Sequence, residues 1–339
     1  MYNISLITGD GIGPELSESA ISILETIHDK LDVNTKIISL EAGDVALEKY
    51  GHALPDETFE SIKSSNACLK APVGESAADV IVVLRRKLDL FANIRPAKSY
   101  PNTPALRDDV DLVIVRENTE DLYTGQEFEL DGSAVAMRII TEKASKRIAK
   151  HAFQTAIQRN GKRRVTCVHK SNVMRKTDGL FSKSCESVAK EFPDIKFDQM
   201  YVDACSMNLI RQPQDFDVIV TTNLFGDILS DESSQVVGGL GMAPAANIGD
   251  NFGLFEPVHG AAFDIAGKQI ANPTSFILSI KMMLEWLGTK NNDQNASSAA
   301  KILEDTVLNI VNSGVATKDI GGTMSTREFT KEVTSKLSD

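Results

Sequence analysis

The sequence has few features that would direct the chain to an oxidising compartment, a membrane or nucleic acid. It contains only 4 cysteines, and Cys68, Cys167, Cys185 and Cys205 lack CxxC spacing, so we expect reduced thiols rather than disulfides or a zinc site. No run approaches about 18 uninterrupted apolar residues, and the N-terminus lacks a basic segment before an apolar one, so neither a membrane span nor a signal peptide is expected. The net charge of −11 disfavours general nucleic-acid or anionic-membrane binding. These absences predict a cytoplasmic protein.

The remaining composition is that of a globular α/β enzyme. Hydrophobic residues make up 42% and charged residues 24% of 339 residues, enough for one large domain or two smaller ones. Short apolar runs, each followed by an amphipathic helical segment, recur along the chain. The expected strands are 4–8, 67–71, 165–168 and 217–220, and the helices that follow them start near 14, 77, 179 and 227. This alternation predicts an α/β fold with largely parallel strand pairing.

Two segments depart from that alternation. Residues 127–141 indicate two strands turned at Asp131-Gly132, a dipeptide typical of tight hairpins. Such a hairpin is either an arm that crosses to a partner subunit or an ordinary surface hairpin. Residues 291–298 have the composition of a polar linker.

A glycine-rich turn, GDGIGPE at 9–15, follows the first expected strand. Its spacing is GxGxG followed by proline, not the GxGxxG of a Rossmann site, and no acidic strand end follows about 20 residues later at a convincing position. A tight strand-to-helix turn explains the motif, and a backbone loop close to a cofactor is the alternative.

Acidic residues form the first candidate site. Asp227 and Asp231 are four residues apart on an expected helix, so both carboxylates lie on one face. Unpaired like charges at this spacing are mildly destabilising, and a divalent cation such as Mg²⁺ would reverse that cost. Asp203 follows another apolar strand. A solvated surface pair is the competing explanation, but the apolar flanks at 218–220 and 228–229 place the two acids at the end of a buried strand rather than on an open face. Both explanations stay open at this point.

Arginines form the second candidate site. Arg85, Arg95 and Arg116 lie at expected helix or strand ends in apolar surroundings. The guanidinium group meets carboxylates with two parallel hydrogen bonds, which suits a di- or tricarboxylic acid. Separate local salt bridges are the alternative for each arginine. Tyr123 and Lys170 are the further candidates for proton transfer, because burial or a nearby cation can tune either group.

Motifs along nearly the whole chain resemble the β-decarboxylating dehydrogenases, the family of isopropylmalate, isocitrate and homoisocitrate dehydrogenases. In family order they are GDGIGPE at 9–15, LRRKLDLFANIRPAK at 84–98, VRENTEDLYTG at 115–125, HKSNV at 169–173, NLFGDILSD at 223–231, GGLGMAPAANIGD at 238–250 and FEPVHGAAFDIAGKQIANPT at 255–274. The resemblance implies two α/β domains around a substrate cleft, 1–96 plus 238–339 and 97–237, with a hairpin arm at about 127–141 and a cofactor site that is not of Rossmann type.

The resemblance also implies roles for individual residues. Arg85, Arg95 and Arg116 match the family's clamp on the malate carboxylates, with Asp203 and Asp227 beside the substrate. Tyr123 matches the proton donor, and Lys170 the lysine that acts in the partner's site. Asp227 and Asp231 match ligands of Mg²⁺ or Mn²⁺ on one subunit and Asp203 the ligand from the other, so a homodimer with shared sites is expected, with a higher oligomer left open.

The expected cofactor is NAD. Asp264 stands where the family distinguishes NAD from NADP, because an acid there accepts hydrogen bonds from a ribose hydroxyl and repels a 2′-phosphate. A helix-capping aspartate is the plain alternative and is compatible with that role. The resemblance assigns the rest of the cofactor site to His259, Gly260, Ala261, Ala262, Ile265 and Asn272.

The expected substrate is 3-isopropylmalate, converted to 2-oxoisocaproate in leucine biosynthesis. Family specificity comes from the helix that leads into Arg85, where Ile81 and Val82 have pocket-facing spacing. An apolar wall suits an isopropyl group and leaves a third carboxylate poorly solvated, although plain core packing would explain both residues. Segment 74–79 resembles archaeal members, some of which accept several malates. Homoisocitrate and isocitrate are therefore the alternatives, and a catalytically silent regulatory subunit is a more distant one.

Overall fold

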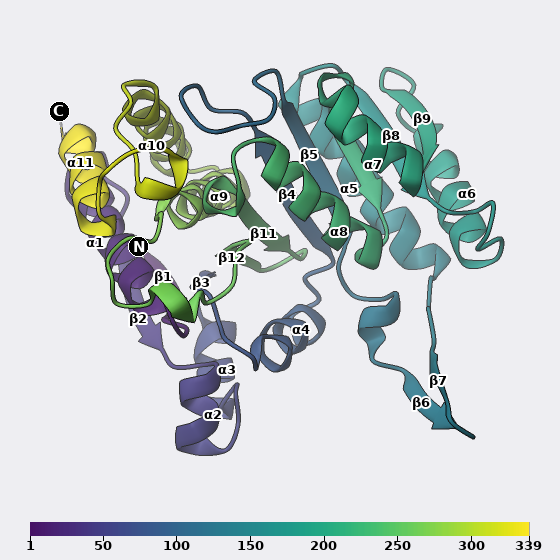
Figure 1. The fold of residues 1–339 in the computed structure, drawn as a ribbon, viewed down its shortest axis with the longest axis horizontal. Coiled ribbons are helices and arrows are strands. Elements are labelled where there is room, and N and C mark those ends of the chain that lie inside the picture. The colour runs from purple at the N-terminus through teal and green to yellow at the C-terminus, as the bar shows by residue number, and fades with distance from the viewer. Residues whose placement is uncertain (339) are drawn as a thin grey trace.

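One ten-stranded sheet runs through the whole molecule in this computed structural model, which describes residues 1–338. The strand order is β2-β1-β3-β12-β11-β4-β5-β10-β8-β9 (Figure 1). The strands are β1 (Tyr2–Ile7), β2 (Thr35–Leu40), β3 (Ala67–Lys70), β4 (Ala92–Lys98), β5 (Asp111–Glu117), β8 (Arg164–His169), β9 (Lys196–Tyr201), β10 (Val218–Thr221), β11 (Pro244–Ile248) and β12 (Gly253–Pro257). Within this sheet, pairing is antiparallel for β11 with β12, β11 with β4, and β4 with β5, and parallel for the other described ladders, so the expectation of largely parallel pairing is confirmed.

Eleven α-helices lie within the described residues and cover both faces of the sheet. They are α1 (Gly13–Leu31), α2 (Asp44–Tyr50), α3 (Asp56–Ser64), α4 (Ala77–Lys87), α5 (Glu142–Arg159), α6 (Thr177–Ala189), α7 (Val202–Arg211), α8 (Asn223–Val236), α9 (Thr274–Asn291), α10 (Gln294–Asn312) and α11 (Thr326–Ser338). In Figure 1 the two ends of the sheet carry separate groups of helices, α1 with α9–α11 at one end and α5–α8 at the other.

The alternation of side chains along the strands explains this layering. In β5, Val113 and Val115 belong to the core that contains α5 and α6, whereas Leu112 and Ile114 belong to the core that contains α7 and α8. Successive strand residues point to opposite faces of a sheet. A strand covered by helices on both faces therefore becomes a continuous apolar run, and Val218–Thr221 is buried throughout.

The expected hairpin is present as β6 (Glu127–Leu130) and β7 (Ser133–Ala136), whose residues are all exposed. Asp131 and Gly132 both have positive φ, 49° and 78°, the backbone that a tight two-residue hairpin turn requires. Figure 1 shows this hairpin projecting away from the body of the protein.

Two details of the sequence-based prediction change. The helix expected at 227–237 begins at Asn223. The polar linker at 291–298 is wrong: α9 ends at Asn291 and α10 begins at Gln294. Ala296, Ala299 and Ala300 are the buried face of α10, and the polar residues between them are its solvent face. The proposed boundary between 96 and 97 falls inside the continuous strand β4.

The structure bears on two of the expected absences, those of disulfide bonds and of a membrane span. All 4 cysteines are buried and free. Along residues 1–338, no helix combines the length and the apolar character that crossing a bilayer requires.

Candidate active site

A cavity of about 270 Å³ opens where β4, β5 and α8 face α4 and β12. We call its two sides the charged wall (Arg95, Arg116, Tyr123, Asp227) and the apolar wall (Val73, Ala77, Ala78, Ile81, Val82). The structure therefore brings together all three predicted arginines, the predicted tyrosine, one predicted metal ligand and both predicted specificity residues.

The charged wall is held by ion pairs onto Asp227. Arg116, only 1% exposed, forms a very short contact through Nη1 with Asp227 Oδ1, and Arg95 Nη1 lies 3.4 Å from the same oxygen. The phenolic O–H of Tyr123 donates to Asp227 Oδ2. Gly226 lets α8 approach this closely, because a Cβ there would lie 2.5 Å from Arg116 Cγ.

The two arginines determine the charge state of Asp227. Burial alone would raise the pKa of this carboxyl, but the fields of Arg116 and Arg95 outweigh it and hold the pKa below its usual range. Asp231, one turn later, lies 3.4 Å from Arg95 but is more exposed, and burial raises its pKa. The strand before this segment, β10, and Leu229 are buried as expected, whereas Ile228 is 57% exposed.

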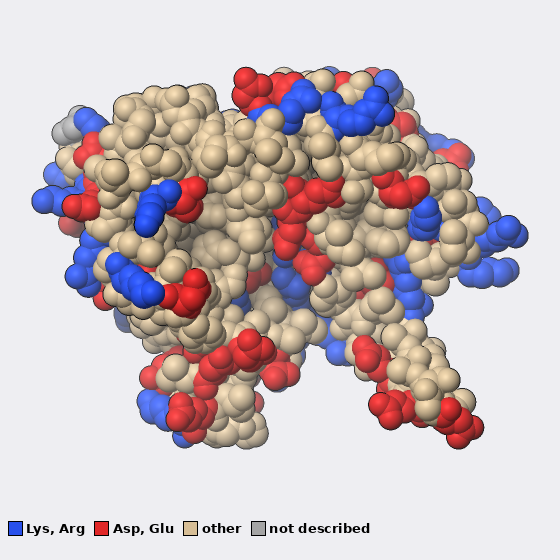
Figure 2. Space-filling view, viewed as in Figure 1, with Lys and Arg blue, Asp and Glu red and all other residues tan. Residues whose placement is uncertain are grey.

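Carboxylates four residues apart beside an open cavity have the donor chemistry that Mg²⁺ or Mn²⁺ requires. Figure 2 shows acidic side chains gathered over α8, where the surface is hollowed between the two ends of the molecule. Within residues 1–338, however, no group of three His, Cys, Asp or Glu side chains converges closely enough to hold a metal. One chain thus fits part of a metal site and leaves the remaining ligands to water, substrate or a second chain.

Lys170 and Asp203 lie together, apart from the cavity. Lys170 follows β8 and Asp203 is in the first turn of α7. Their side chains form a very short ion pair, and this hydrogen bond from Lys170 lowers the pKa of Asp203. Neither residue lines the cavity that holds Asp227, so a single chain does not bring the predicted lysine to the predicted tyrosine.

A buried polar cluster at the base of the cavity was not predicted from the sequence. Glu256 accepts from Lys70 Nζ at 2.9 Å and from Asn247 Nδ2 at 2.8 Å, and Arg85 Nη2 lies 3.4 Å away. Burial would raise the pKa of Glu256, but Lys70 and Arg85 lower it to about 2. Two features of the sequence point to this cluster: Lys70 is a lysine inside an apolar strand, and Glu256 is the acid of the FEPVHG motif.

The predicted cofactor residues are only partly gathered at this cavity. His259 and Gly260 line it. The Ala261 carbonyl accepts from Ile12 N at 2.8 Å and packs on Gly11, so the 9–15 motif is a tight turn against the segment predicted to bind the cofactor. Asp264 and Ile265 lie further on in a short 3-10 helix (Phe263–Ile265) after Ala262, and Asn272 donates to Asp319 at 3.0 Å.

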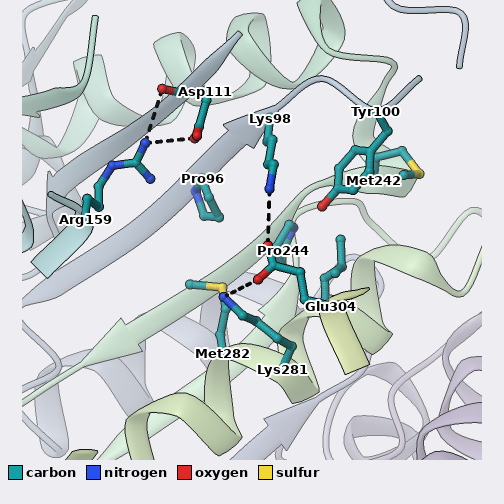
Figure 3. Close-up of a pocket in the computed structure, with 11 residues that line it drawn as sticks. Pro96, Lys98, Tyr100, Asp111, Arg159, Met242, Pro244, Lys281, Met282 and Glu304 are labelled. Atoms are coloured by element: carbon teal, nitrogen blue, oxygen red, sulfur yellow. Dashed lines mark hydrogen bonds and ion pairs between the residues drawn. The ribbon is translucent and has the colours of Figure 1, made fainter. Parts of the chain in front are cut away.

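A second cavity, of about 160 Å³, contains none of the predicted site residues. Lys98, Tyr100 and Arg159 contribute to its lining (Figure 3). Glu304 lies 3.6 Å from Lys98 and 3.3 Å from Lys281, bridging β4 to α9 and α10. The predicted site residues therefore line the first cavity and not this one.

The family model for isocitrate/isopropylmalate dehydrogenase matches residues 3–333. The chain belongs to that family. It is 51% identical over 334 residues to a 3-isopropylmalate dehydrogenase of Saccharolobus solfataricus, covering 98% of each chain. It is 46% identical over 344 residues to an isocitrate/homoisocitrate dehydrogenase of Thermus thermophilus, covering 99% of this chain and 98% of the other. The crystal structure of isocitrate dehydrogenase from Methylococcus capsulatus superposes with a TM-score of 0.93 at 42% identity, covering 100% of both chains. The resemblance and the fold class expected from the sequence are thus confirmed.

Proposed function

We propose that this family member catalyses the NAD-dependent and Mg²⁺- or Mn²⁺-dependent oxidative decarboxylation of 3-isopropylmalate to 2-oxoisocaproate, a step of leucine biosynthesis. The observation that carries the proposal is one cavity with a charged wall opposite an apolar wall. Relatives at about half identity that bear the 3-isopropylmalate name support the same substrate.

The two walls match the two halves of this substrate. Arg95 and Arg116 supply guanidinium groups for its two carboxylates, and Arg85, near the end of α4, lines the same cavity. Ile81 and Val82 supply the contact for the isopropyl group. In isocitrate or homoisocitrate a third carboxylate would lie against these side chains without a hydrogen-bond donor, which is costly in a desolvated site. Those substrates are the second choice.

Asp227 and Asp231 would hold the metal, together with Asp203 of a second chain. When bound, the cation withdraws charge from the substrate's hydroxyl and neighbouring carboxylate and from the enolate left by loss of CO₂. Arg116 and Arg95 keep Asp227 ionised and oriented for that role.

Tyr123 and Lys170 would move the protons. Burial and the hydrogen bond to Asp227 raise the pKa of Tyr123, so its O–H stays protonated near neutral pH and can be delivered to carbon 3 of the product enolate. Lys170 would take the proton of the substrate hydroxyl, directly or through a water, as hydride passes from carbon 2 to the nicotinamide.

NAD would lie along His259 to Ala262, with Asp264 accepting hydrogen bonds from the adenosine ribose. Ile265 and Asn272 would complete the adenosine side. An acid at Asp264 repels the 2′-phosphate of NADP, which supports NAD as the cofactor.

A homodimer with shared sites would complete each cavity. Lys170 and Asp203 are paired with each other away from Asp227. Large apolar side chains are exposed on α7, α8 and the arm, namely Met207, Ile210, Ile228, Phe128, Leu130 and Met137. Exposed apolar surface of this kind is typical of an interface, so a second copy covering it would bring Lys170 and Asp203 to the other chain's site.

The test is NADH formation by purified protein with Mg²⁺ or Mn²⁺, comparing 3-isopropylmalate, isocitrate and homoisocitrate. We expect the highest kcat/KM with 3-isopropylmalate. A higher kcat/KM with isocitrate would overturn the substrate assignment. No turnover with any of the three would favour a silent regulatory subunit, although Arg85, Arg95, Arg116, Tyr123, Lys170, Asp203, Asp227 and Asp231 are all present.

A further inference from the structure

Arg138, which follows β7 at the base of the arm, is a nearly buried cation between two buried acids. Its side chain is 11% exposed, whereas the side chains of Asp121 and Asp178 are 0% exposed. Arg138 Nε lies 2.8 Å from Asp121 Oδ1, and Nη1 lies 3.2 Å from Asp178 Oδ1. A second nitrogen, Nη2, donates to Asp121 Oδ2 at 3.2 Å. One guanidinium therefore bridges two carboxylates from separate parts of the chain.

Each of these carboxylates also holds backbone. Asp178 Oδ2 accepts from the backbone N–H of Lys170 at 2.5 Å. Asp121 Oδ1 accepts from Leu122 N at 2.9 Å, and its Oδ2 accepts from Leu224 N at 3.1 Å. Arg138 thereby connects the base of the arm with the turn that carries Lys170.

The two carboxylates depend on Arg138 to different degrees. Asp121 retains two backbone N–H donors if Arg138 is removed. Asp178 would retain only the N–H of Lys170 and a weak contact with Thr177 Oγ1 at 3.4 Å. Burial raises the pKa of Asp178, and the Lys170 N–H and Arg138 oppose that shift. Loss of Arg138 would therefore disturb the Lys170 turn more than the Asp121 side, which leads into Tyr123.

We propose that Arg138, acting through Asp178, is a positioning residue for Lys170 and couples the arm to the lysine that transfers the proton. This inference rests on the proposed function, in which Lys170 acts in the partner's site. A partner chain that seats the arm would then also set the geometry of the lysine it receives.

The first experiment compares Arg138→Gln with Arg138→Lys and with the exposed control Arg327→Gln, whose Nη2 donates to Glu18 Oε2 at 3.1 Å. Displacement of a catalytic group by about 1 Å costs on the order of 100-fold in rate, so we expect a fall in kcat of that size in Arg138→Gln. KM for 3-isopropylmalate should change little, because the arginines of the charged wall are untouched. Arg138→Lys keeps the charge and should restore most of kcat. A rise in KM with unchanged kcat would overturn the proposal.

The second experiment uses mixed dimers to separate a positioning role from general destabilisation. Asp227→Asn paired with Lys170→Met should regain activity, since one of the two sites is then intact. A mixed dimer of Arg138→Gln with Asp227→Asn should regain activity in the same way. The misplaced Lys170 of the Arg138→Gln chain then enters the site that Asp227→Asn has already inactivated. Arg138→Gln should not complement Lys170→Met. The proposal would be overturned if Arg138→Gln complements Lys170→Met, or if it complements neither of the two variants.

Failure of the Asp227→Asn and Lys170→Met pair itself would reject shared sites, and with them that part of the proposed function. The link between Arg138 and Asp178 would then be tested by combining Arg138→Gln with Asp178→Asn in one chain and comparing the kcat of the double variant with that of each single variant. If Arg138 acts through Asp178, the double variant should be no slower than Arg138→Gln alone. Additive losses would reject the link.

Discussion

The charged wall and the apolar wall of the cavity are built in different ways. In the charged wall, Arg116 is 1% exposed and each charged group is fixed by a partner: Arg116 and Arg95 contact Asp227, and Tyr123 donates to it. In the apolar wall, Ile81 and Val82 are half-buried on α4, whose fully buried face is formed by Val80 and Leu84.

This difference separates two properties of the enzyme. Buried charge is costly unless it is paired, so the charged wall can change little without losing its arrangement. Half-buried apolar side chains can be exchanged for others of similar size at small cost. We therefore expect the charged wall to determine the reaction type and the apolar wall to determine which malate is accepted.

Asp227→Asn should have the largest effect, because it breaks the charged wall. Loss of the carboxylate removes a metal ligand and the partner of Arg116, and we expect kcat to fall by about 10³-fold, or about 4 kcal/mol. The exposed Asp305→Asn on α10 is the matched control and should retain full activity. Chelation of Mg²⁺ or Mn²⁺ by EDTA should reproduce the loss in the wild type. Appreciable turnover by Asp227→Asn would reject the metal assignment.

Glu256→Gln tests the buried charges below both walls. The pKa of Glu256 in the folded protein is about 2, against an ordinary 4.5. A lowered folded pKa contributes stability that is present above pH 4.5 and is lost as pH falls toward 2, in total about 3 kcal/mol. Glu256→Gln should lower the free energy of unfolding by about that amount at pH 7 and flatten its decline below pH 4.5.

Urea unfolding at pH 7 and at several values below 4.5 would measure both effects. Glu304→Gln is the comparison, because its ion pairs at 3.3 and 3.6 Å are partly exposed and should contribute at most about 1 kcal/mol. Equal decreases in the free energy of unfolding of the two variants would mean that burial of the Glu256 cluster adds no stability.

Ile81→Ser should affect selectivity rather than the chemical step. Removal of an apolar contact costs about 2 kcal/mol, so we expect kcat/KM for 3-isopropylmalate to fall about 30-fold. The ratio of kcat/KM for isocitrate to that for 3-isopropylmalate should rise. Val83→Ser on the same helix does not alter a residue that lines the cavity and should leave the ratio unchanged. An unaltered ratio in Ile81→Ser would assign Ile81 to plain packing.

The same contrast explains what the sequence could predict. Paired strand and helix periodicity located four of the strands of the sheet, each with the helix that follows it, and the Asp131-Gly132 turn was found because it needs positive φ at both positions. Arg95, Arg116 and Asp227 were recognisable because charge in an apolar context requires an explanation. Their convergence on one carboxylate depends on the order β4-β5-β10, which no local pattern encodes.

Three other features could not be predicted from local sequence patterns. The polar residues after Asn291 were misread because a solvent-facing helix face and a linker have the same composition. Lys70 and Glu256 lie 186 positions apart and meet only because β3 pairs with β12. Ile228 is exposed although its neighbour Leu229 is buried, because apolar character alone does not distinguish a core position from an exposed one.

Asp264 lies outside both walls and should give the smallest effect. One hydrogen bond to a charged acceptor contributes about 1.5 kcal/mol, so Asp264→Ala should lower kcat/KM with NAD about tenfold. Lys268 Nζ already donates to the Asp264 carbonyl at 2.7 Å, leaving a cation beside the vacated position. Activity with NADP should therefore rise in Asp264→Ala as that with NAD falls. Asp264→Asn separates the two causes, because it retains an acceptor for the ribose and removes the repulsion of a phosphate. A cofactor preference that is unchanged in both variants would place discrimination elsewhere in residues 259–272.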